Sequence, residues 1–470
     1  MTPAERFQCK ALWPDHWQAK ISGAVMLLSS RNIIRGVGWT TILYFIAVGF
    51  RFVSSVILSR LLAPNIMGMM VIINTIRLGV ELFSDIGIGQ NIVQNKNGGR
   101  PTFYNTAWII QIARGFFLSS ILFLFARTFS EYYQVDDHMI QAASLSLALA
   151  GFMSTSIYLM QRHLKIVQLS VFELSQEVMA STIGIIAAII NPSIWSLIIA
   201  GVISTAIRVI LTHFLPGAGQ MLIFSKKHAG EIFSFGKWIF LSSLLMFMSS
   251  NFDRLFLGQV APLAMLGVYG ISRAIADLPS VLVNRLSHSL VFPVIASART
   301  VPRAEVRARL SRLRLKLLAA AAIALAAGIS VADLVVHVIY DDRYLDAGWM
   351  LIVLLSGVWL SILASLNEYS LLGLGRPVYG VIGNTLKLGA LIYVLPHAFA
   401  QYGMFGAVVG IAMADLPRLC ILLFGQFRER FSFIRQDIAT TIQLALFIVI
   451  FSAVRYYFGF GTLLDTLPIR

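Results

Sequence analysis

The chain has 470 residues, of which 57% are hydrophobic and 13% charged, and its formal net charge is +15. A mean hydropathy of +0.78 excludes an ordinary soluble globular domain and indicates a polytopic membrane protein. The basic excess follows the loops in a pattern that reports topology, so we do not expect a nucleic-acid partner.

The first 36 residues are predicted to form a cytoplasmic tail. They carry scattered charges, and their apolar run is too short for a signal peptide or a span. Met26 is an alternative start to Met1. The two cysteines, Cys9 and Cys420, offer no disulfide framework, and no histidine has metal-ligand spacing in a soluble loop, so we expect neither a metal nor another cofactor.

Thirteen apolar segments follow, each long enough to cross a bilayer as a helix. Their approximate limits are residues 37–58, 67–89, 103–126, 139–160, 171–190, 194–213, 237–257, 264–284, 316–339, 348–367, 378–396, 404–424 and 437–457. We therefore expect an all-α membrane protein of about 12–14 transmembrane helices.

Lys and Arg residues fall mainly on alternate connections. One side of the predicted membrane carries 23 of them, including the run from Arg299 to Lys316, and the other carries four: Arg60, Arg127, Arg343 and Arg470. By the positive-inside rule the first side is cytoplasmic, which places the N-terminus inside and, with thirteen spans, the C-terminus outside. The basic run is interpreted as an orientation anchor, with capture of a donor diphosphate as the alternative.

Two parts of the chain resemble each other at an offset of 196 to 199 residues. Trp39 corresponds to Trp238, the run Ala63–Gly68 to the run Ala261–Gly267, and the pair Arg77/Glu81 to the pair Arg273/Asp277. A repeat of six spans preserves orientation, so we expect two parallel six-helix bundles around a central cavity. The predicted divisions are a tail (1–36), an N-terminal bundle (37–213), a cytoplasmic linker (214–236), a C-terminal bundle (237–424), and an additional C-terminal helix with its tail (425–470).

The second span contains three charges, Arg77, Glu81 and Asp85. Four-residue steps on a helix rotate the side chain by only about 40°, so these charges share one face. The apolar residues of the span contribute about −6 kcal/mol to insertion, whereas three central charges cost roughly +2.5 to +3.5 kcal/mol each. This face must therefore be ion-paired or line a wet cavity.

Other segments also contain charges at membrane depth. They are Arg51, Arg77, Arg114, Arg208, Arg254, Arg273, Arg285, Lys387, Arg418 and Arg455, with Glu81, Asp85, Glu173, Glu177, Asp253, Asp277, Asp333 and Asp415. A purely structural interpretation pairs Arg77 with Glu81, Arg273 with Asp277, and Arg254 with an acid on a neighbouring span. A functional interpretation remains open beside it, because the first, second, seventh and eighth spans are expected to converge on the repeat axis.

Four runs indicate a family: S-D-I-G-I-G-Q-N-I-V-Q-N (84–95), N-T-A-W-I-I-Q-I-A-R-G (105–115), F-D-R-L-F-L-G (252–258) and L-G-L-G-R-P (372–377). With them the chain resembles the polysaccharide-transporter branch of the multidrug/oligosaccharidyl-lipid/polysaccharide exporter superfamily. The resemblance implies a flippase that moves a polyprenyl-diphosphate-linked oligosaccharide across the bacterial inner membrane by alternating access, for surface polysaccharide synthesis. Other polysaccharide-assembly membrane proteins are further candidate partners, beside membrane lipids.

Guanidinium groups suit a diphosphate because their rigid fork donates paired, charge-assisted hydrogen bonds. The candidate substrate-binding residues are Arg51, Arg77, Arg254 and Arg273. The carboxylates Glu81, Asp85, Asp253 and Asp277 are candidates either for orienting these arginines or for binding a coupling proton or sodium ion.

Two other classes of protein are disfavoured. The chain lacks the G-x-x-x-x-G-K-[ST] loop of an ATP-driven pump, and its longest predicted outer loop, Arg127 to Met139, is too short for a catalytic domain, so we do not expect an enzyme. A cation-coupled multidrug antiporter of the same superfamily remains the alternative. Such a protein would need a mainly acidic cavity, whereas arginines are at least as numerous as acids in the four central spans.

Overall fold

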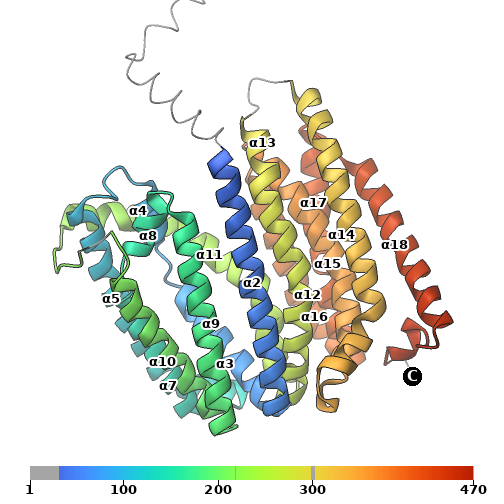
Figure 1. Cartoon of the computed structure of the whole chain (residues 1–470), viewed down its shortest axis with the longest axis horizontal. Helices are drawn as coiled ribbons and strands as arrows, with labels where there is room; N and C mark the ends of the chain where they lie inside the picture. The colour runs from blue at the N-terminus through green and yellow to red at the C-terminus, as the bar shows by residue number, and fades with distance from the viewer. Residues whose placement is uncertain (1–30, 218, 298–301, 469–470) are drawn as a thin grey trace, which may run out of the picture.

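The computed structural model describes residues 31–217, 219–297 and 302–468, and all regular elements in these ranges are helical (Figure 1). The α-helices are α2 (Arg31–Leu61), α3 (Pro64–Leu82), α4 (Ile88–Gln94), α5 (Pro101–Leu124), α6 (Ala126–Tyr133), α7 (Asp137–Gly151), α8 (Ser156–Arg162), α9 (Ile166–Ile190), α10 (Ile194–His213), α11 (Lys226–Val260), α12 (Leu263–Leu286), α13 (Phe292–Ser297), α14 (Arg303–Ile339), α15 (Ala347–Gly373), α16 (Val378–Met413), α17 (Asp415–Arg428) and α18 (Ile434–Tyr457). Short π or 3-10 segments are η2 (Ser287–Val291), η3 (Asp342–Tyr344) and η4 (Leu463–Thr466). The predicted tail lies outside the described residues as far as residue 30.

The number of helices that could span a membrane agrees with the sequence. Within the described ranges, ten helical segments are long and apolar enough, and two bent pairs, α7 with α8 and the two parts of α11, raise the number to twelve. One of the ten is the continuous run Val378–Arg428, which is too long for a single span. If this run is two spans, the total becomes the predicted thirteen.

The run Val378–Arg428 does fold back on itself. Gly403 has φ 58° and ψ −143°, which interrupts α16. Lys387 Nζ lies 2.9 Å from Asp415 Oδ2 although 28 residues separate them, whereas a straight helix would hold them roughly 40 Å apart. The chain therefore reverses near Gly403, as the two predicted spans 378–396 and 404–424 require.

The predicted second span, 67–89, is broken in the structure. α3 ends at Leu82 and α4 begins at Ile88. Between them Gly87 adopts the left-handed conformation at φ 60°, and its N–H donates to the Asp85 carboxylate at 2.9 Å. An apolar window could not predict this break, because it depends on a carboxylate that replaces the helical hydrogen-bond acceptor. Similarly, the predicted fourth span is bent by 54° between α7 and α8.

Two charged segments are more helical than predicted. Residues 226–236, assigned to the linker, are the first turns of α11, and α14 begins at Arg303, well before the apolar segment at 316.

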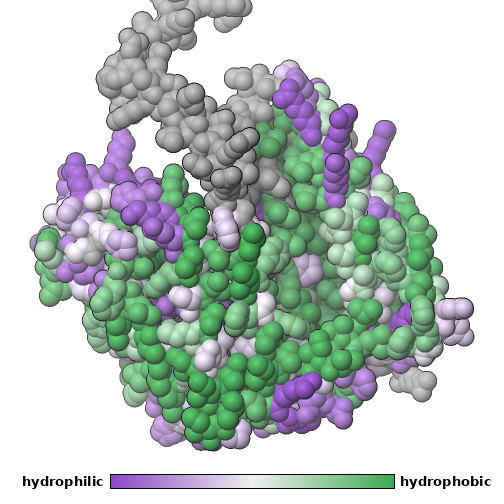
Figure 2. All heavy atoms as spheres, viewed as in Figure 1, coloured by the Kyte–Doolittle hydropathy of each residue, from purple (hydrophilic) through white to green (hydrophobic). Residues whose placement is uncertain are grey.

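The helices differ in how much of their surface the fold covers: 78% of the residues in the apolar window of α15 are buried, against 6% in that of α2. α15 is therefore a central helix, whereas few residues of α2 are fully buried. Figure 2 shows apolar side chains across the middle of the visible face and hydrophilic ones towards its two ends.

The first turns of α3 and α12 meet at a pair of glycines that the repeat relates to each other. A Cβ atom on Gly68 would lie 1.8 Å from the Leu263 carbonyl oxygen, and one on Gly267 would lie 2.0 Å from the Pro64 carbonyl oxygen. The two helices thus approach backbone to backbone with matching neighbours, as close small-residue packing in membranes allows. We call this contact the glycine seam.

Further contacts surround the glycine seam at the same end of the helices. Arg60 donates to the Ile339 carbonyl at 2.8 and 3.1 Å, and the Tyr344 hydroxyl donates to the Leu62 carbonyl at 3.0 Å. Burial raises the pKa of Tyr344, in the turn between α14 and α15, to about 12. This end, which the charge bias predicts to be outside, is closed between α2 and the C-terminal helices.

α18, the additional C-terminal helix, packs along α14 through two ion pairs. Arg314 lies 2.5 Å from Asp437 near the start of both helices, and Asp333 lies 2.5 Å from Arg455 near their ends. Because the charges are reversed between the two ends, the two pairs fix the register and the parallel direction of the helices.

Candidate functional site

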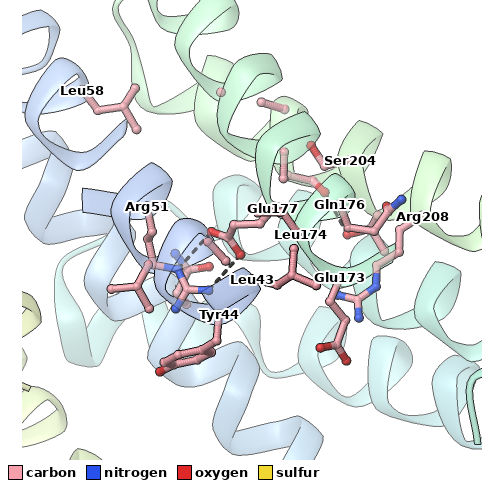
Figure 3. Close-up of a pocket in the computed structure, with 18 of the residues that line it drawn as sticks. Leu43, Tyr44, Arg51, Leu58, Glu173, Leu174, Gln176, Glu177, Ser204 and Arg208 are labelled. Atoms are coloured by element: carbon pink, nitrogen blue, oxygen red, sulfur yellow. Dashed lines mark hydrogen bonds and ion pairs between the residues drawn. The ribbon is translucent and has the colours of Figure 1, made fainter. Parts of the chain in front are cut away.

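A cavity of about 660 Å³ lies between α2, α3, α9 and α10 (Figure 3). α2 lines it with residues at three- and four-residue spacing, from Thr40 through Tyr44 to Arg51, so one face of the helix supplies this wall. We call it the N-half cavity. It contains the charged groups Arg51, Arg208, Arg285, Glu173 and Glu177.

Two arginines of the N-half cavity differ in their partners. Arg51 forms a bidentate pair with Glu177, with N–O distances of 2.9 and 2.8 Å. Among the described residues, Arg208 forms neither an ion pair nor a side-chain hydrogen bond, and Figure 3 shows it beside Glu173 on the side away from Arg51. The buried Gln176 Oε1 on the same wall also accepts no hydrogen bond. An unpaired guanidinium at membrane depth needs water or an anionic ligand.

A second cavity, of about 650 Å³, lies between α11, α12, α15, α16 and α17. We call it the C-half cavity. Its charged groups form two ion-paired clusters, which together we call the C-half network. The N–O distances are Arg254–Asp277 (3.9 Å), Arg273–Asp277 (3.3 Å) and Arg273–Asp253 (3.8 Å) in the first cluster, and Lys387–Asp415 (2.9 Å), Arg418–Asp415 (2.9 Å) and Arg418–Glu368 (2.5 Å) in the second. Four cations and four carboxylates therefore neutralise one another within this half.

Asp253 is the most buried member of that network, with 3% of its surface exposed. It accepts a hydrogen bond from the Tyr269 hydroxyl and faces Arg273, so its charge is compensated by two residues one turn apart on the same face of α12. A buried carboxylate held in this way orients its arginine and leaves little capacity for another cation.

A third cavity, of about 280 Å³, lies between the α3–α4 break, α5 and α8 and contains Glu81, Asp85 and Arg114. Arg114 donates to Ser84 Oγ at 2.7 Å and to the Glu81 carbonyl, and Ser243 Oγ of α11 donates to Asp85 at 3.2 Å. We call it the α3–α5 cavity. Its charges hold the broken helix in place against α5 and α11.

The structure places the predicted site residues in three groups. Arg51 lines the N-half cavity, Arg254, Arg273 and Asp277 line the C-half cavity with Asp253 bonded behind them, and Glu81 and Asp85 line the α3–α5 cavity. Arg77 lines none of the three; its side chain is 34% exposed and lies 3.9 Å from Glu81. It continues the face of α3 on which Met67, Met70 and Asn74 line the N-half cavity.

The predicted ion pairs are present. Arg77 pairs with Glu81, Arg273 pairs with Asp277, and Arg254 of α11 pairs with Asp277 of α12. Sequence reasoning counted Arg208, Arg114, Lys387, Arg418 and Asp415 as charges at membrane depth but did not select them. Their position within apolar segments was the available signal. Most of their partners could not be identified from the sequence, because the partners of Arg114 and Lys387, and Glu368 beside Arg418, come from other helices.

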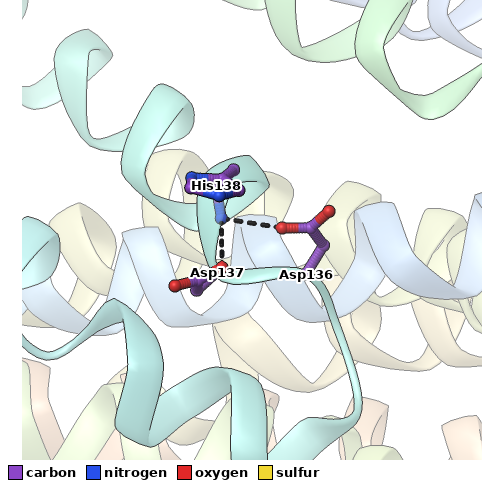
Figure 4. Close-up of side chains that lie close together, drawn as sticks. All are labelled: Asp136, Asp137 and His138. Atoms are coloured by element: carbon purple, nitrogen blue, oxygen red, sulfur yellow. Dashed lines mark hydrogen bonds between the residues drawn. The ribbon is translucent and has the colours of Figure 1, made fainter.

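The turn before α7 brings ligand-type side chains together. One ligand atom each of Asp136, Asp137 and His138 lies within 4.8 Å of the others (Figure 4), a group that the sequence reasoning did not single out. Both carboxylates accept the His138 backbone N–H, at 2.9 and 3.0 Å. This is helix capping at an exposed N-terminus, which accounts for the arrangement.

Comparisons with known protein sequences show the family to which the chain belongs. Residues 57–348 match a protein family described as polysaccharide biosynthesis protein. The lipopolysaccharide biosynthesis protein WzxC of Escherichia coli (strain K12) is 22% identical over 271 residues, covering 56% of this chain and 54% of that protein. The chain thus matches about half the length of this relative.

Solved structures extend the likeness to nearly the whole chain. The lipid II flippase MurJ, in an inward closed conformation, superposes with a TM-score of 0.68 at 11% identity, covering 90% of this chain and 99% of that chain. An inward-facing multidrug resistance MATE family transporter gives a TM-score of 0.57 at 14% identity, covering 82% and 94%. At these identities the likeness shows a shared fold.

Proposed function

Since the chain belongs to the polysaccharide biosynthesis protein family and is a multi-pass membrane transporter, we propose that it flips a polyprenyl-diphosphate-linked oligosaccharide across the bacterial inner membrane. The observation that carries this proposal is the N-half cavity, which presents Arg51 and the unpaired Arg208 between helices that could span the membrane. Its volume of about 660 Å³ suits a headgroup, while a polyprenyl tail would remain in lipid.

The chemistry of the substrate explains the choice of arginine. A diphosphate offers several anionic oxygens, and a guanidinium donates paired hydrogen bonds to them and stays protonated at physiological pH. A phosphate could bind Arg208 without breaking an ion pair. At Arg51 a phosphate would replace Glu177 as the partner of the guanidinium. Arg77, one turn beyond Asn74 on the cavity face of α3, would extend the same surface.

Arg254 and Arg273 remain candidate contacts from the C-terminal half. Both are held by carboxylates, so binding would require Asp277 to release one of them. We therefore assign the first contact with the diphosphate to the N-half cavity and a later contact to the C-half cavity, as the two halves move.

The contacts between the proposed halves, residues 37–213 and 237–424, support alternating access as the mechanism. At the predicted outer end the glycine seam closes α3 against α12. At the other end Arg285 of α12 lies 4.3 Å above the Tyr44 ring of α2 and donates to the Thr40 carbonyl at 3.1 Å. A transport cycle would open the glycine seam and would break the Arg285 contact in the opposite state.

A coupling proton or sodium ion would fit the α3–α5 cavity better than the C-half cavity. Asp253, Asp277 and Asp415 are each compensated by one or more partly buried cations. Among the described residues, the Glu81 carboxylate has only the 3.9 Å contact with Arg77, and the Asp85 carboxylate accepts neutral donors at the break in the helix. We assign ion coupling to Glu81 and Asp85 and an orienting role to Asp253 and Asp277.

The fold shared with a multidrug transporter keeps the cation-coupled antiporter as the alternative. The composition of the N-half cavity disfavours it, because three arginines and two glutamates line the cavity. A site for lipophilic cations would instead have an excess of acids.

Deletion of the gene from its bacterium separates these two functions. A flippase predicts loss of a surface polysaccharide, accumulation of its lipid-linked precursor inside, and unchanged resistance to lipophilic cations. Unchanged surface polysaccharide with increased drug sensitivity would establish the antiporter instead.

A further inference from the structure

The end of the protein where α14 and α18 begin is strongly basic. Residues 303–316 and 428–437 contain nine Lys and Arg residues against three Asp and Glu residues. A cleft of about 580 Å³ opens there, lined by Ala304, Arg307 and Ser311 of α14 and by Phe433, Arg435 and Gln436 from the chain entering α18. We call it the α14–α18 cleft. Arg299, the first residue of the predicted basic run, lies outside the described residues.

The three carboxylates of this region form ion pairs with arginines that do not line the cleft. Glu305 pairs with Arg309 at 2.5 Å, and Asp437 pairs with Arg314 at 2.5 Å. Glu429 accepts Arg303 at 3.3 Å and Arg376 at 3.1 Å. None of these carboxylates lines the cleft.

Arg307 and Arg435 are the two basic residues that line the cleft. Neither forms an ion pair or a side-chain hydrogen bond with any residue in the described ranges. The cleft therefore presents two guanidinium groups and, among its lining residues, no carboxylate. Such a cleft is a site for an anion with several oxygens.

The wall between these arginines is polar and held in position. The Gln436 side-chain amide donates to the Ser311 carbonyl at 3.1 Å and also bonds to the Ser311 hydroxyl, which joins α18 to α14 across the cleft. Behind this wall Arg314 is fully buried and lies 4.9 Å from the Phe433 ring centroid. These contacts fix the position of the two helix ends that carry Arg307 and Arg435.

One side of the α14–α18 cleft continues into an apolar surface. Ile434 lines the cleft and is 46% exposed, and Ile438 and Ile442 follow at four-residue spacing on α18, 55% and 64% exposed. A ligand with an anionic head and hydrocarbon chains would match both parts, whereas a free phosphate would match only the head.

We propose that the α14–α18 cleft binds the phosphate headgroup of an anionic phospholipid through Arg307 and Arg435, with the acyl chains along Ile434, Ile438 and Ile442. The predicted topology places this cleft at the cytoplasmic surface, where anionic lipids attract basic residues. The site is separate from the three cavities of the transport proposal and does not depend on it. It gives the basic run a specific ligand beyond its role in orientation.

The test uses purified full-length protein in neutral detergent, titrated with phosphatidylglycerol, phosphatidylcholine or inorganic phosphate. Thermal unfolding and native mass spectrometry report binding. The variant Arg307→Gln/Arg435→Gln is compared with Arg312→Gln/Arg428→Gln, which removes the same charge from the same two segments but from residues that do not line the cleft.

We expect the wild type and the control to bind phosphatidylglycerol with similar Kd, and the cleft variant to bind it roughly 20- to 30-fold more weakly, about five-fold for each arginine. Equal weakening in the control, or unchanged binding in the cleft variant, would overturn the proposal in favour of diffuse attraction. Stabilisation by inorganic phosphate as large as that by phosphatidylglycerol would assign the site to free phosphate. If the double variant does not fold, Arg435→Gln alone against Arg428→Gln gives the same comparison with a roughly five-fold effect.

Discussion

At the scale of single residues, the arginines differ in whether a carboxylate of the fold reaches them. Arg254, Arg273 and Arg418 belong to the neutral network of the C-half cavity, whereas Arg208 has no acidic partner among the described residues. The sequence identifies all four as charges within apolar segments. It cannot separate paired from unpaired ones, because partners such as Glu368 and Arg418 are 50 residues apart.

Arg208→Gln should abolish or strongly slow transport while changing stability by less than about 1 kcal/mol, since no ion pair is broken. Arg418→Gln should destabilise the protein by about 3–5 kcal/mol, because it leaves Asp415 and Glu368 with less compensation. Transport and thermal unfolding measured on the same preparations distinguish the two. Normal transport by Arg208→Gln would remove this residue from the site.

The pair Arg77/Glu81 allows a second test at this scale. If Arg77 contacts diphosphate, Arg77→Lys should impair transport by losing the fork, and Arg77→Ala should be worse. If it only compensates Glu81, Arg77→Lys should transport normally, since lysine keeps the positive charge. The measurement is transport at matched membrane levels, and normal transport by Arg77→Lys would refute the binding role.

At the scale of helices, two features control how the parts of the fold meet: the glycine seam between α3 and α12, and the two ion pairs between α14 and α18. The sequence predicted both glycine-containing motifs as related by the repeat, on the pattern Ala-Pro followed by Gly. It did not predict that they touch, because apolar periodicity identifies a helix face but not its partner.

Gly68→Val should hold the glycine seam open, because even a Cβ atom there would lie 1.8 Å from the Leu263 carbonyl oxygen. In a background without cysteine, Asn74→Cys should then react faster with an impermeant thiol reagent added from outside. Gly389→Val is the control, since nothing lies within 4 Å of a Cβ at that position and the residue does not line the N-half cavity. Unchanged labelling in Gly68→Val would mean that the glycine seam does not close the outer side.

Asp437→Asn should destabilise the protein by about 3–5 kcal/mol, because it leaves the fully buried Arg314 without its carboxylate. The double variant Arg314→Leu/Asp437→Leu should recover most of this loss, since it leaves no unpaired charge. Thermal unfolding of the purified variants measures both effects. Equal destabilisation in the single and double variants would show that side-chain packing, rather than the ion pair, holds α18 against α14.

At the scale of the whole molecule, apolar runs predicted an all-helical membrane protein, and the helices of the structure agree with it. Four short sequence runs predicted the family, which the match over residues 57–348 confirms. The break at Gly87 and the bend before α8 were missed because window averages do not register single hydrogen bonds. A central cavity was predicted from the repeat axis. The charges expected to line it lie mainly in three cavities of the described chain, because the face of each helix decides which side chains meet.

The predicted topology can be tested independently of transport. Figure 1 places the start of α2 and the C-terminal end at opposite ends of the helices. Reporter fusions should therefore give a cytoplasmic signal at residue 308 and an outside signal at residue 465. A cytoplasmic signal at 465 would mean that one of the thirteen segments does not cross the membrane.

The most direct test of the transport proposal is translocation by the purified protein in liposomes. A labelled polyprenyl-diphosphate oligosaccharide is placed in both leaflets, and an external enzyme that cleaves only accessible headgroups reports movement. We predict that wild-type protein makes nearly all of the substrate accessible, that Arg51→Ala/Arg208→Ala leaves about half protected, and that Arg127→Ala, a change in an exposed pair with Glu131, behaves as wild type. Full protection of the inner leaflet with wild-type protein, or equal translocation by the double variant, would contradict the account.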